Sequence, residues 1–328
     1  MKALHLLGAI KVGGGQSVAL NYSIILKQLG VSSVFYGTKF HDEGFAHHLE
    51  NYGEVTYDFT PQLIKESNII FVHTNKNLLK LLNLKIKTNI LAGKQIVYIQ
   101  HLNYPKNKFR LLSYIINYVC TDFIQITPIT SDNVNRYISI RKHFIVNFKL
   151  LSYPESEWKQ IRNDVRSELG YDSNDIVYVY SARFMEGKNV SKFVELAKSA
   201  VHHKNMKFLL LGDGPENEDA KLYKSDNYKW LGFQSDVERY LIASDVYLFV
   251  SLYKLEMMPM ALVEAINYNL SIASFDTDIN RFLLNDRVFS DITLDVIEKW
   301  QQLPNGSNMT KYNDAYAFEK IRDLIKTN

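Results

Sequence analysis

Short apolar runs alternate with segments of helical periodicity along the sequence, and this alternation restricts the fold more than any other feature. Consecutive apolar residues over four to eight positions are typical of strands buried on both faces, as in parallel sheets covered by helices. The expected strands are 3–7, 33–36, 69–73, 95–100, 123–127, 176–180, 207–211, 246–250 and 271–275. The expected helices include 16–29, 107–119, 191–199, 236–243 and 259–267. The pattern predicts an α/β protein with parallel sheets.

The length of 328 residues favours two domains. Both halves repeat the same plan, so we expect two doubly wound, Rossmann-like domains over 1–151 and 152–310, joined where Pro154 interrupts the pattern. A Pro304-Asn305-Gly306 turn and an amphipathic pattern over 311–326 predict a last helix, within 311–328, that crosses back to the first domain. Ligands of doubly wound domains bind beyond the carboxyl ends of the strands, so we expect the site in a crevice there.

Composition narrows the function classes. The single cysteine, Cys120, excludes an internal disulfide and favours a reducing compartment. No run approaches the ~20 apolar residues of a membrane span. The apolar start is followed by Lys11 and glycines, which favours a first strand over a signal peptide and predicts a cytoplasmic protein.

The two halves differ in charge. Residues 1–150 carry a net charge of +9 and the remainder −6, although the whole chain has only +3. The basic half is expected to meet an anionic partner, such as phospholipid or a pyrophosphate-bearing acceptor. Nucleic acid is not expected, because no concentrated basic run or binding motif is present.

A glycine run separates the first strand from the first helix. Gly13, Gly14 and Gly15 would let backbone amides approach an anion at the helix start. The spacing differs from the G-x-G-x-x-G of dinucleotide-binding loops, and a simple strand-to-helix turn is the alternative.

The stretch SARFMEGK, residues 181–188, follows a strand of the second half. Arg183 and Lys188 lie just past its carboxyl end, where a planar guanidinium and a compact ammonium suit phosphate. Two solvated surface cations are the alternative.

The third feature is SLYKLEMMPMALVE, residues 251–264. Pro259 is well placed to open a helix, because its ring presets the backbone dihedral. Glu256 would precede that helix and Glu264 would lie one turn inside it. Carboxylates there can bind sugar or ribose hydroxyls while the helix amides hold phosphate, although two glutamates at this spacing also occur by chance.

Taken in order, these segments resemble the retaining glycosyltransferases of GT-B fold known as family 4, or glycosyl transferases group 1. GGGQSVALNYSIILKQLG resembles the family's N-terminal loop and helix. RSELGYDSNDIVYVYSARFMEGKNVSKFVELA, FLLLGDGPENEDAKL and WLGFQSDVERYLIASDVYLFVS resemble successive parts of its nucleotide-binding domain. EMMPMALVE matches its E-x7-E motif. The resemblance covers nearly the whole chain.

The resemblance implies donor-side roles. Arg183 and Lys188 would neutralise the diphosphate as the sugar bond breaks, in place of a metal. Glu256 would hold hydroxyls of the donor sugar, and Glu264 the ribose. The remaining donor-binding positions, which would contribute backbone, are Gly14, Gly15, Gly212, Met257, Met258 and Met260.

The resemblance also places residues of the first domain near the reaction. His101, in VYIQHLNYP, lies where the family has a histidine near the reacting sugar. His73 ends another strand, and the acceptor-side candidates are Gly13, His73 and Asn75. A histidine at a strand end is otherwise more often structural.

Departures from the family's pattern affect the choice of sugar. Ala182 stands where the family usually has a glycine, and Met257 and Met258 replace glycines after the first glutamate. Lys254 and Leu255 are extra residues before Glu256.

The implied activity is a metal-independent transfer, with retention, from a nucleotide-diphosphate sugar to a glycan or lipid-linked acceptor. A UDP-sugar is the favoured donor, no cofactor is expected, and capsule, O-antigen or lipopolysaccharide synthesis is the expected setting. The alternatives are an epimerase or phosphorylase acting on a sugar nucleotide, and a non-catalytic GT-B binding partner. Asp276-Thr277-Asp278 mimics the D-x-D metal motif but follows a strand late in the second domain.

Residues 104–120, YPKNKFRLLSYIINYVC, place Lys106, Lys108 and Arg110 beside an apolar and aromatic helix. Such a helix can dock peripherally on the anionic inner face of a membrane. A core helix with a basic start is the equal alternative.

Overall fold

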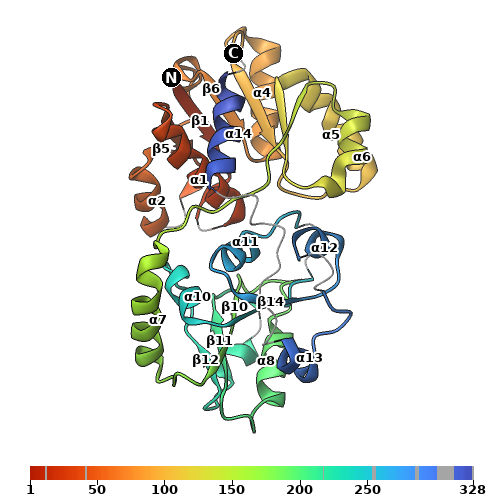
Figure 1. Ribbon diagram of the computed structural model, residues 1–328. Helices are drawn as coiled ribbons and strands as arrows, with labels where there is room; N and C mark the ends of the chain where they lie inside the picture. The colour runs from red at the N-terminus through yellow and green to blue at the C-terminus, as the bar shows by residue number, and fades with distance from the viewer. Residues whose placement is uncertain are drawn as a thin grey trace. The chain divides into compact units, whose positions relative to one another are not determined.

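The computed structural model describes residues 1–11, 13–40, 43–216, 218–252, 256–284, 288–300 and 314–326. These residues form an α/β protein with two parallel sheets, which confirms the predicted fold class (Figure 1). The chain divides into two compact units. The first comprises Met1–Lys149, Leu255–Met260 and Tyr312–Asn328, and the second comprises Leu150–Lys254 and Ala261–Lys311.

The sheet of the first unit has seven parallel strands in the order β5-β3-β1-β6-β7-β8-β9. Their bounds are β1 Lys2–Leu6, β3 Ser32–Tyr36, β5 Gly53–Thr56, β6 Ile69–Val72, β7 Gln95–Ile99, β8 Asp122–Gln125 and β9 Arg141–Phe144. The short strands β2 Ala9–Ile10 and β4 Lys39–Phe40 form a separate pair. The strand order reverses between β1 and β6, so the loops that leave these strands diverge and open a crevice at this point.

The helices of the first unit cover both faces of this sheet. They are α1 Gly14–Gln28, α2 Glu43–Glu50, α3 Pro61–Glu66, α4 Asn75–Lys87, α5 Lys106–Val119, α6 Ser131–Tyr137 and α14 Asp314–Lys326, with a 3-10 turn at Pro128–Thr130. Side chains along β1 and just after it alternate between two cores: Leu4 and Leu6 pack in one, and Leu7, directly after β1, packs in the other with residues of α1. This alternation is the reason that β1 reads as a continuous apolar run.

The last helix belongs to the first unit, as expected. Helix α14 packs against α1 (Figure 1). Gln95 Nε2 donates to the Leu324 carbonyl at 2.9 Å, and Tyr316 Oη donates to the Phe144 carbonyl at 3.3 Å. The Pro304-Asn305-Gly306 turn, residues 311–313, Lys254 and Leu255 lie outside the described residues.

The second unit has five parallel strands in the order β12-β11-β10-β13-β14. They are β10 Ile176–Ser181, β11 Met206–Leu211, β12 Tyr228–Trp230, β13 Val246–Phe249 and β14 Ser271–Ser274. The helices are α7 Glu155–Leu169, α8 Val190–Ser199, α9 Glu218–Leu222, α10 Glu238–Ala243, α11 Met260–Asn267, α12 Asp278–Leu284 and α13 Leu294–Trp300. Here the order reverses between β10 and β13.

The structure corrects several predicted bounds. Strands β5, β9 and β12 were not predicted, because each lies at or near a sheet edge and exposes polar residues, which breaks the apolar run. Helix α1 begins two residues before the expected start at Gln16, since Gly14 and Gly15 already have helical geometry. Helix α11 begins at Met260, with Pro259 directly before it. The short segment Leu255–Met260, which the sequence assigns to the second domain, groups with the first unit.

Candidate functional site

A cavity of about 300 Å³ opens in the first unit at the point where its strand order reverses. It lies beyond the carboxyl ends of β1, β6 and β7 and beside the start of α1, where ligands of doubly wound folds bind. Its lining includes Leu7, Gly8, Gly15, Gln16, His73, Thr74, Asn75, Tyr98, Ile99, His101, Leu102 and Tyr104. The predicted residues His73, Asn75, His101 and Gly15 are therefore brought together.

The two predicted histidines are directly linked. His73 Nδ1 and His101 Nε2 lie 3.0 Å apart and their rings stack with centroids at 5.2 Å. Burial lowers the pKa of His101 to about 4. Burial, with the neighbouring imidazoles of His101 and His5, lowers the pKa of His73 well below its ordinary value. Both rings are neutral near pH 7.

A third histidine, His5 of β1, extends this link and was not predicted. Its Nδ1 lies 3.2 Å from His73 Nε2, and its ring stacks on Phe71 with centroids at 4.8 Å. His5 is fully buried, and this burial lowers its pKa to about 3. A single histidine inside the apolar run ALHLL was the available signal, because buried polar groups are retained only where a partner satisfies them.

A second polar chain lines the cavity through Asn75. Tyr98 Oη donates to Asn75 Oδ1 at 2.7 Å, and Asn75 Nδ2 donates to Tyr104 Oη at 2.9 Å. Burial raises the pKa of both phenols, so both keep their protons at neutral pH. Tyr98 and Tyr104 were also missed by the sequence analysis, since tyrosines in apolar strands and loops usually belong to the core.

The glycine run begins α1 beside this cavity. Gly13 caps the helix with an extended backbone, and its carbonyl accepts from the Ser17 amide at 2.9 Å. A Cβ at Gly15 would lie 3.8 Å from His101, and one at Gly14 would lie 3.9 Å from Met260 Cγ. The Gln16 side chain donates to the Ala9 carbonyl at 2.8 Å and so holds the turn closed. The helix start and His101 therefore share one surface.

The segment from Glu256 to Met260 packs within the first unit. Glu256 forms an antiparallel bridge with Leu102, and Asn147 Nδ2 donates to the Met258 carbonyl at 3.3 Å. The side chains of Met257, Met258 and Met260 are buried. The donor-binding role of their backbone stays a prediction.

In the second unit, the loop after β10 carries Arg183 and Lys188. The side chain of Arg183 is exposed, that of Lys188 is half-buried, and Phe184 between them is fully buried and anchors the loop. The Phe184 amide donates to the Asp213 carbonyl at 2.9 Å. Tyr180 Oη donates to the Lys188 carbonyl at 2.7 Å. The two cations thus stand on a loop with a fixed backbone at the point where the strand order reverses.

Gly212 allows this loop to sit close to its neighbour. Its φ of +117° favours glycine, and a Cβ there would lie 1.9 Å from the Ala182 carbonyl oxygen. The Gly212 amide donates to the Gly232 carbonyl at 2.7 Å. The structure therefore gives Gly212 a positioning role beside the Arg183 loop.

Two other predicted acids lie in the second unit. Glu264 is half-buried on α11. Asp276, of the D-x-D-like stretch, is held by Arg281, whose Nε and Nη2 lie 2.5 Å from its two carboxylate oxygens. Among the described residues, no group of three or more His, Cys, Asp or Glu side chains could hold a metal ion.

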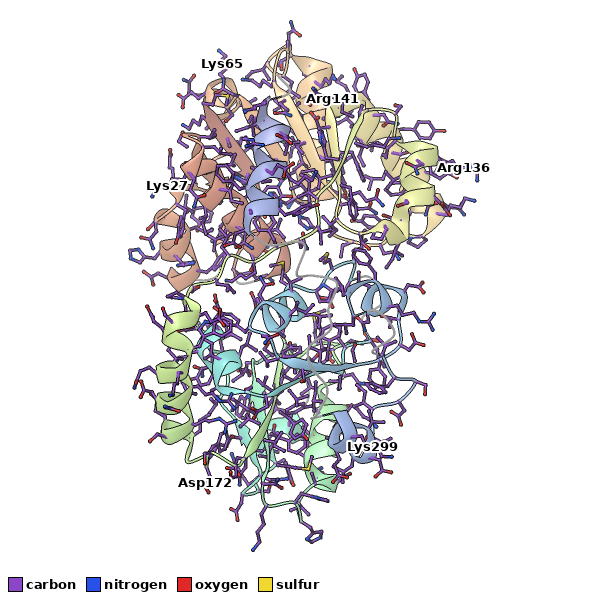
Figure 2. All side chains as sticks on the ribbon, viewed as in Figure 1. Lys27, Lys65, Arg136, Arg141, Asp172 and Lys299 are labelled. Atoms are coloured by element: carbon purple, nitrogen blue, oxygen red, sulfur yellow. The ribbon has the colours of Figure 1, made fainter. Side chains whose placement is uncertain are left out.

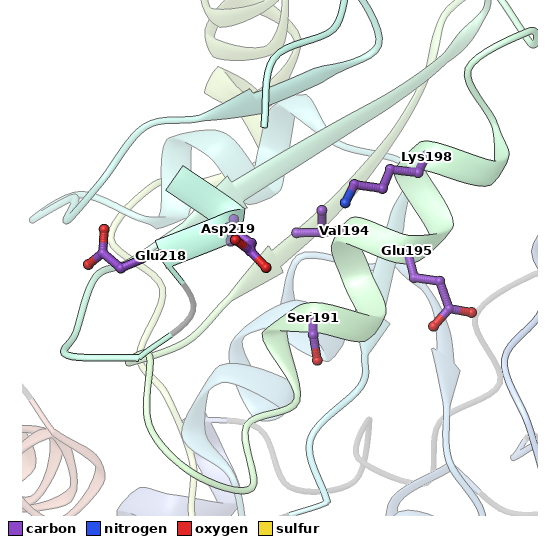
Figure 3. A pocket seen from close by; sticks show the side chains of 7 residues that line it. Ser191, Val194, Glu195, Lys198, Glu218 and Asp219 are labelled. Carbon is purple, nitrogen blue, oxygen red and sulfur yellow. The ribbon is translucent and has the colours of Figure 1, made fainter. Parts of the chain in front are cut away.

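A separate hollow of about 470 Å³ lies between α8 and α9 of the second unit (Figure 3). Ser191, Glu195 and Lys198 of α8 line it together with Glu218 and Asp219 of α9. It contains none of the predicted site residues, and its mixed exposed charges are those of an ordinary helix surface.

The basic charge of the first half is spread over the surface of the first unit. Lys27, Lys65 and Arg136 are exposed and point outward (Figure 2). No helix within the described part of the chain combines the length and apolar composition of a membrane span.

Comparison with known proteins identifies related sequences. Residues 161–321 match the model of the family Glycosyl transferases group 1. A curated relative is the UDP-Gal:alpha-D-GlcNAc-diphosphoundecaprenol alpha-1,3-galactosyltransferase of Escherichia coli, which is 31% identical over 187 residues. That alignment takes in 48% of this chain and 46% of the relative, so the match spans about half of each.

Solved structures extend the likeness to the whole chain. HepE of Anabaena in complex with UDP-glucose has a TM-score of 0.76 and 15% identity, and the match covers 100% of both chains. WaaG, a glycosyltransferase involved in lipopolysaccharide biosynthesis, has a TM-score of 0.62 and 14% identity over 100% of this chain and 96% of that one. Identities this low establish the fold alone. The chain therefore has the GT-B fold of these enzymes, and its residues 161–321 resemble the Glycosyl transferases group 1 family.

Proposed function

We propose that this protein is a retaining, metal-independent glycosyltransferase of family 4 that moves a sugar from a nucleotide-diphosphate sugar to a glycan or lipid-linked acceptor. The observation that carries the proposal is the family match over 161–321, which contains Arg183, Lys188, Glu256 and Glu264. A UDP-sugar is the favoured donor, because the Escherichia coli relative is named for UDP-Gal and the HepE structure holds UDP-glucose.

The donor is bound through its diphosphate by Arg183 and Lys188. Guanidinium and ammonium groups on a fixed loop stabilise the charge that develops on the leaving diphosphate without reorganising during the reaction. The rigid backbone contacts of this loop at Phe184 support that role. Glu256 holds hydroxyls of the sugar and Glu264 the ribose, while backbone of Met257, Met258, Met260, Gly14, Gly15 and Gly212 completes the donor site.

A metal is not required by this arrangement. Asp276 would be the first ligand of a D-x-D site, but both of its oxygens already accept hydrogen bonds from Arg281. That ion pair would have to break before the carboxylate could coordinate a cation. We expect the enzyme to remain active in the presence of a chelator. Loss of activity would show that a metal ion is required.

The acceptor is held in the first unit by Gly13, His73 and Asn75, with the catalytic residue His101 next to the reacting sugar. The cavity that contains the last three supports this assignment, since its polar lining is neutral and suits hydroxyl groups. The relatives named above support an acceptor from bacterial surface polysaccharide synthesis, such as a lipid-linked GlcNAc or a lipopolysaccharide core.

The donor assignment is tested by thermal shift with UDP, GDP and ADP, followed by transfer assays. UDP should raise the melting temperature most, because a ligand that binds only the folded state stabilises it by mass action. Release of UDP from a UDP-sugar should depend on added acceptor. Equal melting temperatures with all three nucleotides, or UDP release without acceptor, would contradict the proposed transfer.

The cytoplasmic enzyme is further proposed to dock on the inner face of the membrane through α5. One face of α5 is core, with Phe109, Leu112 and Ile116 buried. The opposite face exposes Leu111 by 68%, Tyr114 by 67% and Tyr118 by 53%, next to Lys106, Lys108 and Arg110. Helix α5 therefore packs in the core on one face and is exposed on the other. An exposed aromatic face with neighbouring cations suits an anionic bilayer.

Liposome flotation tests whether this face of α5 binds a membrane or is only exposed to solvent. Vesicles with anionic lipid should carry the protein upward more than neutral vesicles, and the double change Lys108→Glu with Arg110→Glu should remove the difference. Lys65→Glu, on the exposed surface of α3, is the matched control. Flotation that ignores lipid charge would exclude the electrostatic docking.

A further inference from the structure

Three histidines and a serine form one hydrogen-bonded row that runs from the core of the first unit to its cavity. Ser23 Oγ lies 3.2 Å from His5 Nε2, His5 Nδ1 lies 3.2 Å from His73 Nε2, and His73 Nδ1 lies 3.0 Å from His101 Nε2. Ser23 is on α1, and the histidines lie on or just beyond β1, β6 and β7, which are neighbours in the sheet. His5 and His73 each use one ring nitrogen toward one neighbour and the other nitrogen toward the next.

The direction of the row is set at its buried end. Ser23 Oγ donates its only hydrogen to the Ala19 carbonyl at 2.9 Å. The serine oxygen can therefore only accept from the imidazole beside it, so His5 carries its proton on Nε2. A neutral imidazole has one N–H, which leaves His5 Nδ1 as an acceptor.

The same reasoning passes from ring to ring. His73 must donate from Nε2 to His5 Nδ1, and its own Nδ1 then accepts from His101 Nε2. All three rings are neutral, because burial lowers the pKa of His5 to about 3 and of His101 to about 4 and lowers that of His73 as well. A second N–H on any ring, which would break the order, is therefore absent near pH 7.

We propose that Ser23, His5 and His73 are positioning residues that hold His101 in the tautomer protonated at Nε2, so that His101 Nδ1 accepts a hydrogen bond from a hydroxyl group of a sugar in the cavity. Among the described residues no hydrogen bond occupies His101 Nδ1, and His101 lines the cavity. The inference rests on the proposed function for the identity of the hydroxyl-bearing ligand, whereas the tautomer follows from the row alone.

The other side of the cavity carries further polar groups. Tyr98 donates to Asn75 Oδ1 and Asn75 Nδ2 donates to Tyr104 Oη, and the two phenols also interact with each other. The cavity thus presents one fixed acceptor, on His101, beside phenol and amide groups. A sugar hydroxyl can donate to that acceptor, whereas a fully ionised phosphate has no hydrogen to donate.

The tautomer is measured in the full-length protein by long-range ¹H–¹⁵N correlation of the histidine rings, with His101 identified by the signals missing from His101→Gln. We expect a protonated Nε2 and an unprotonated Nδ1 for His101. A protonated Nδ1 in the unaltered protein would overturn the proposal, and this result does not depend on any enzymatic activity.

Ser23→Ala tests what sets the direction. Without the serine oxygen, the buried His5 Nε2–H would have no acceptor, so the row should reverse and His101 should carry its proton on Nδ1. Ser113→Ala is the matched control, because Ser113 is also buried on a helix and donates to a carbonyl of that helix, at 2.7 Å to Arg110, but contacts no histidine. Reversal in both variants, or in neither, would contradict the assigned role of Ser23.

D-glucose serves as the hydroxyl probe for the cavity. Its addition should shift the His101 Nδ1 resonance of the unaltered protein and leave that of exposed His202 in place, and Ser23→Ala should lose the response. Absence of the shift would reject hydroxyl acceptance by Nδ1. If the tautomer and the shift are as expected while no sugar transfer occurs, the proposed function fails and the row stands.

Discussion

The two units reverse their strand order in the same way but surround that point with opposite chemistry. In the first unit, the cavity beside β1 and β6 is lined by neutral imidazoles, an amide and phenols. In the second, the loop after β10 carries an exposed guanidinium and a half-buried ammonium. Burial accounts for the neutral state of the first site, because an imidazole enclosed by protein loses its proton.

This contrast shows how one scaffold serves two kinds of ligand. A neutral cavity with fixed donors and acceptors discriminates hydroxyl groups by direction, and charged phosphate gains nothing from it. Cations on a rigid loop attract a diphosphate whatever group it carries. The glycosyl donor and acceptor need these two kinds of recognition, so the proposed division of labour follows the chemistry of each unit.

The largest expected effect comes from removing the cations. Arg183→Ala and Lys188→Ala should each lower kcat by about 100- to 1000-fold, the range found when one preorganised charge-stabilising group is removed. The affinity of both variants for UDP, measured by calorimetry, should also fall. His101→Ala should leave UDP affinity nearly unchanged, because the imidazole is neutral and belongs to the hydroxyl site.

Lys204→Ala is the control for a change of net charge, since Lys204 is an exposed lysine of the second unit outside the β10 loop. It should retain full activity. Equal loss of UDP affinity in the Arg183 and His101 variants would break the comparison, because both units would then recognise the diphosphate.

A backbone change should separate the shape of the second site from its charge. Gly212→Ala introduces a Cβ 1.9 Å from the Ala182 carbonyl at a φ of +117°, so the 182–188 loop must shift. We expect the free energy of unfolding of the second unit to drop by about 3 kcal/mol and UDP binding to weaken, with Arg183 and Lys188 still present.

Gly170→Ala provides the matched control. Gly170 also has a positive φ, of +68°, but no atom lies within 4 Å of the added Cβ. Gly170→Ala should lower the free energy of unfolding by only about 1 kcal/mol, the cost of placing alanine in the left-handed conformation, and UDP binding should be unchanged. If the two alanine variants bind UDP equally, the close approach at Gly212 does not position the cations.

The second site was largely predictable from sequence because its parts are local. Arg183 and Lys188 follow a strong apolar run, and the loop after a parallel strand must lie at the ligand-binding edge. The loop that carries Arg183 and Lys188 directly follows strand β10 in the sequence. Its position could therefore be predicted without knowing the strand order or which face of the sheet a side chain occupies. The fold class was predictable for the same reason.

The first site was only partly predictable. His73 and His101 end strands and could be assigned to the edge, but His5 contacts His73 across 68 residues. That contact requires knowing that β1 and β6 are neighbours and which face His5 occupies. The bridge between Leu102 and Glu256 depends similarly on packing between distant segments, which explains why the sequence placed Glu256 with the second domain.

A pH dependence of stability in the first unit tests the comparison most directly. An unfolded histidine has a pKa near 6.5, whereas folded His5 and His101 have pKa values of about 3 and about 4. Above pH 6.5 both states are neutral and these groups add no pH dependence. As the pH falls below 6.5, the unfolded state gains protons that the folded state cannot, so stability decreases by about 1.4 kcal/mol per pH unit for each histidine, down to the folded pKa.

The two units can be followed separately in this experiment, because all three tryptophans, Trp158, Trp230 and Trp300, belong to the second unit. Amide hydrogen exchange in β1 and β6 reports the first. Between pH 7 and pH 5 we expect the protection factors of these strands, which correct for the slower intrinsic exchange at lower pH, to fall while the urea midpoint from tryptophan fluorescence moves less. His5→Gln should reduce the change of stability per pH unit measured in β1 and β6 by about 1.4 kcal/mol, the contribution of one histidine. His202→Gln, at an exposed position, should not change it. A slope unchanged by His5→Gln would mean that the imidazole is charged in the folded protein, and the contrast between a neutral and a cationic unit would then be wrong.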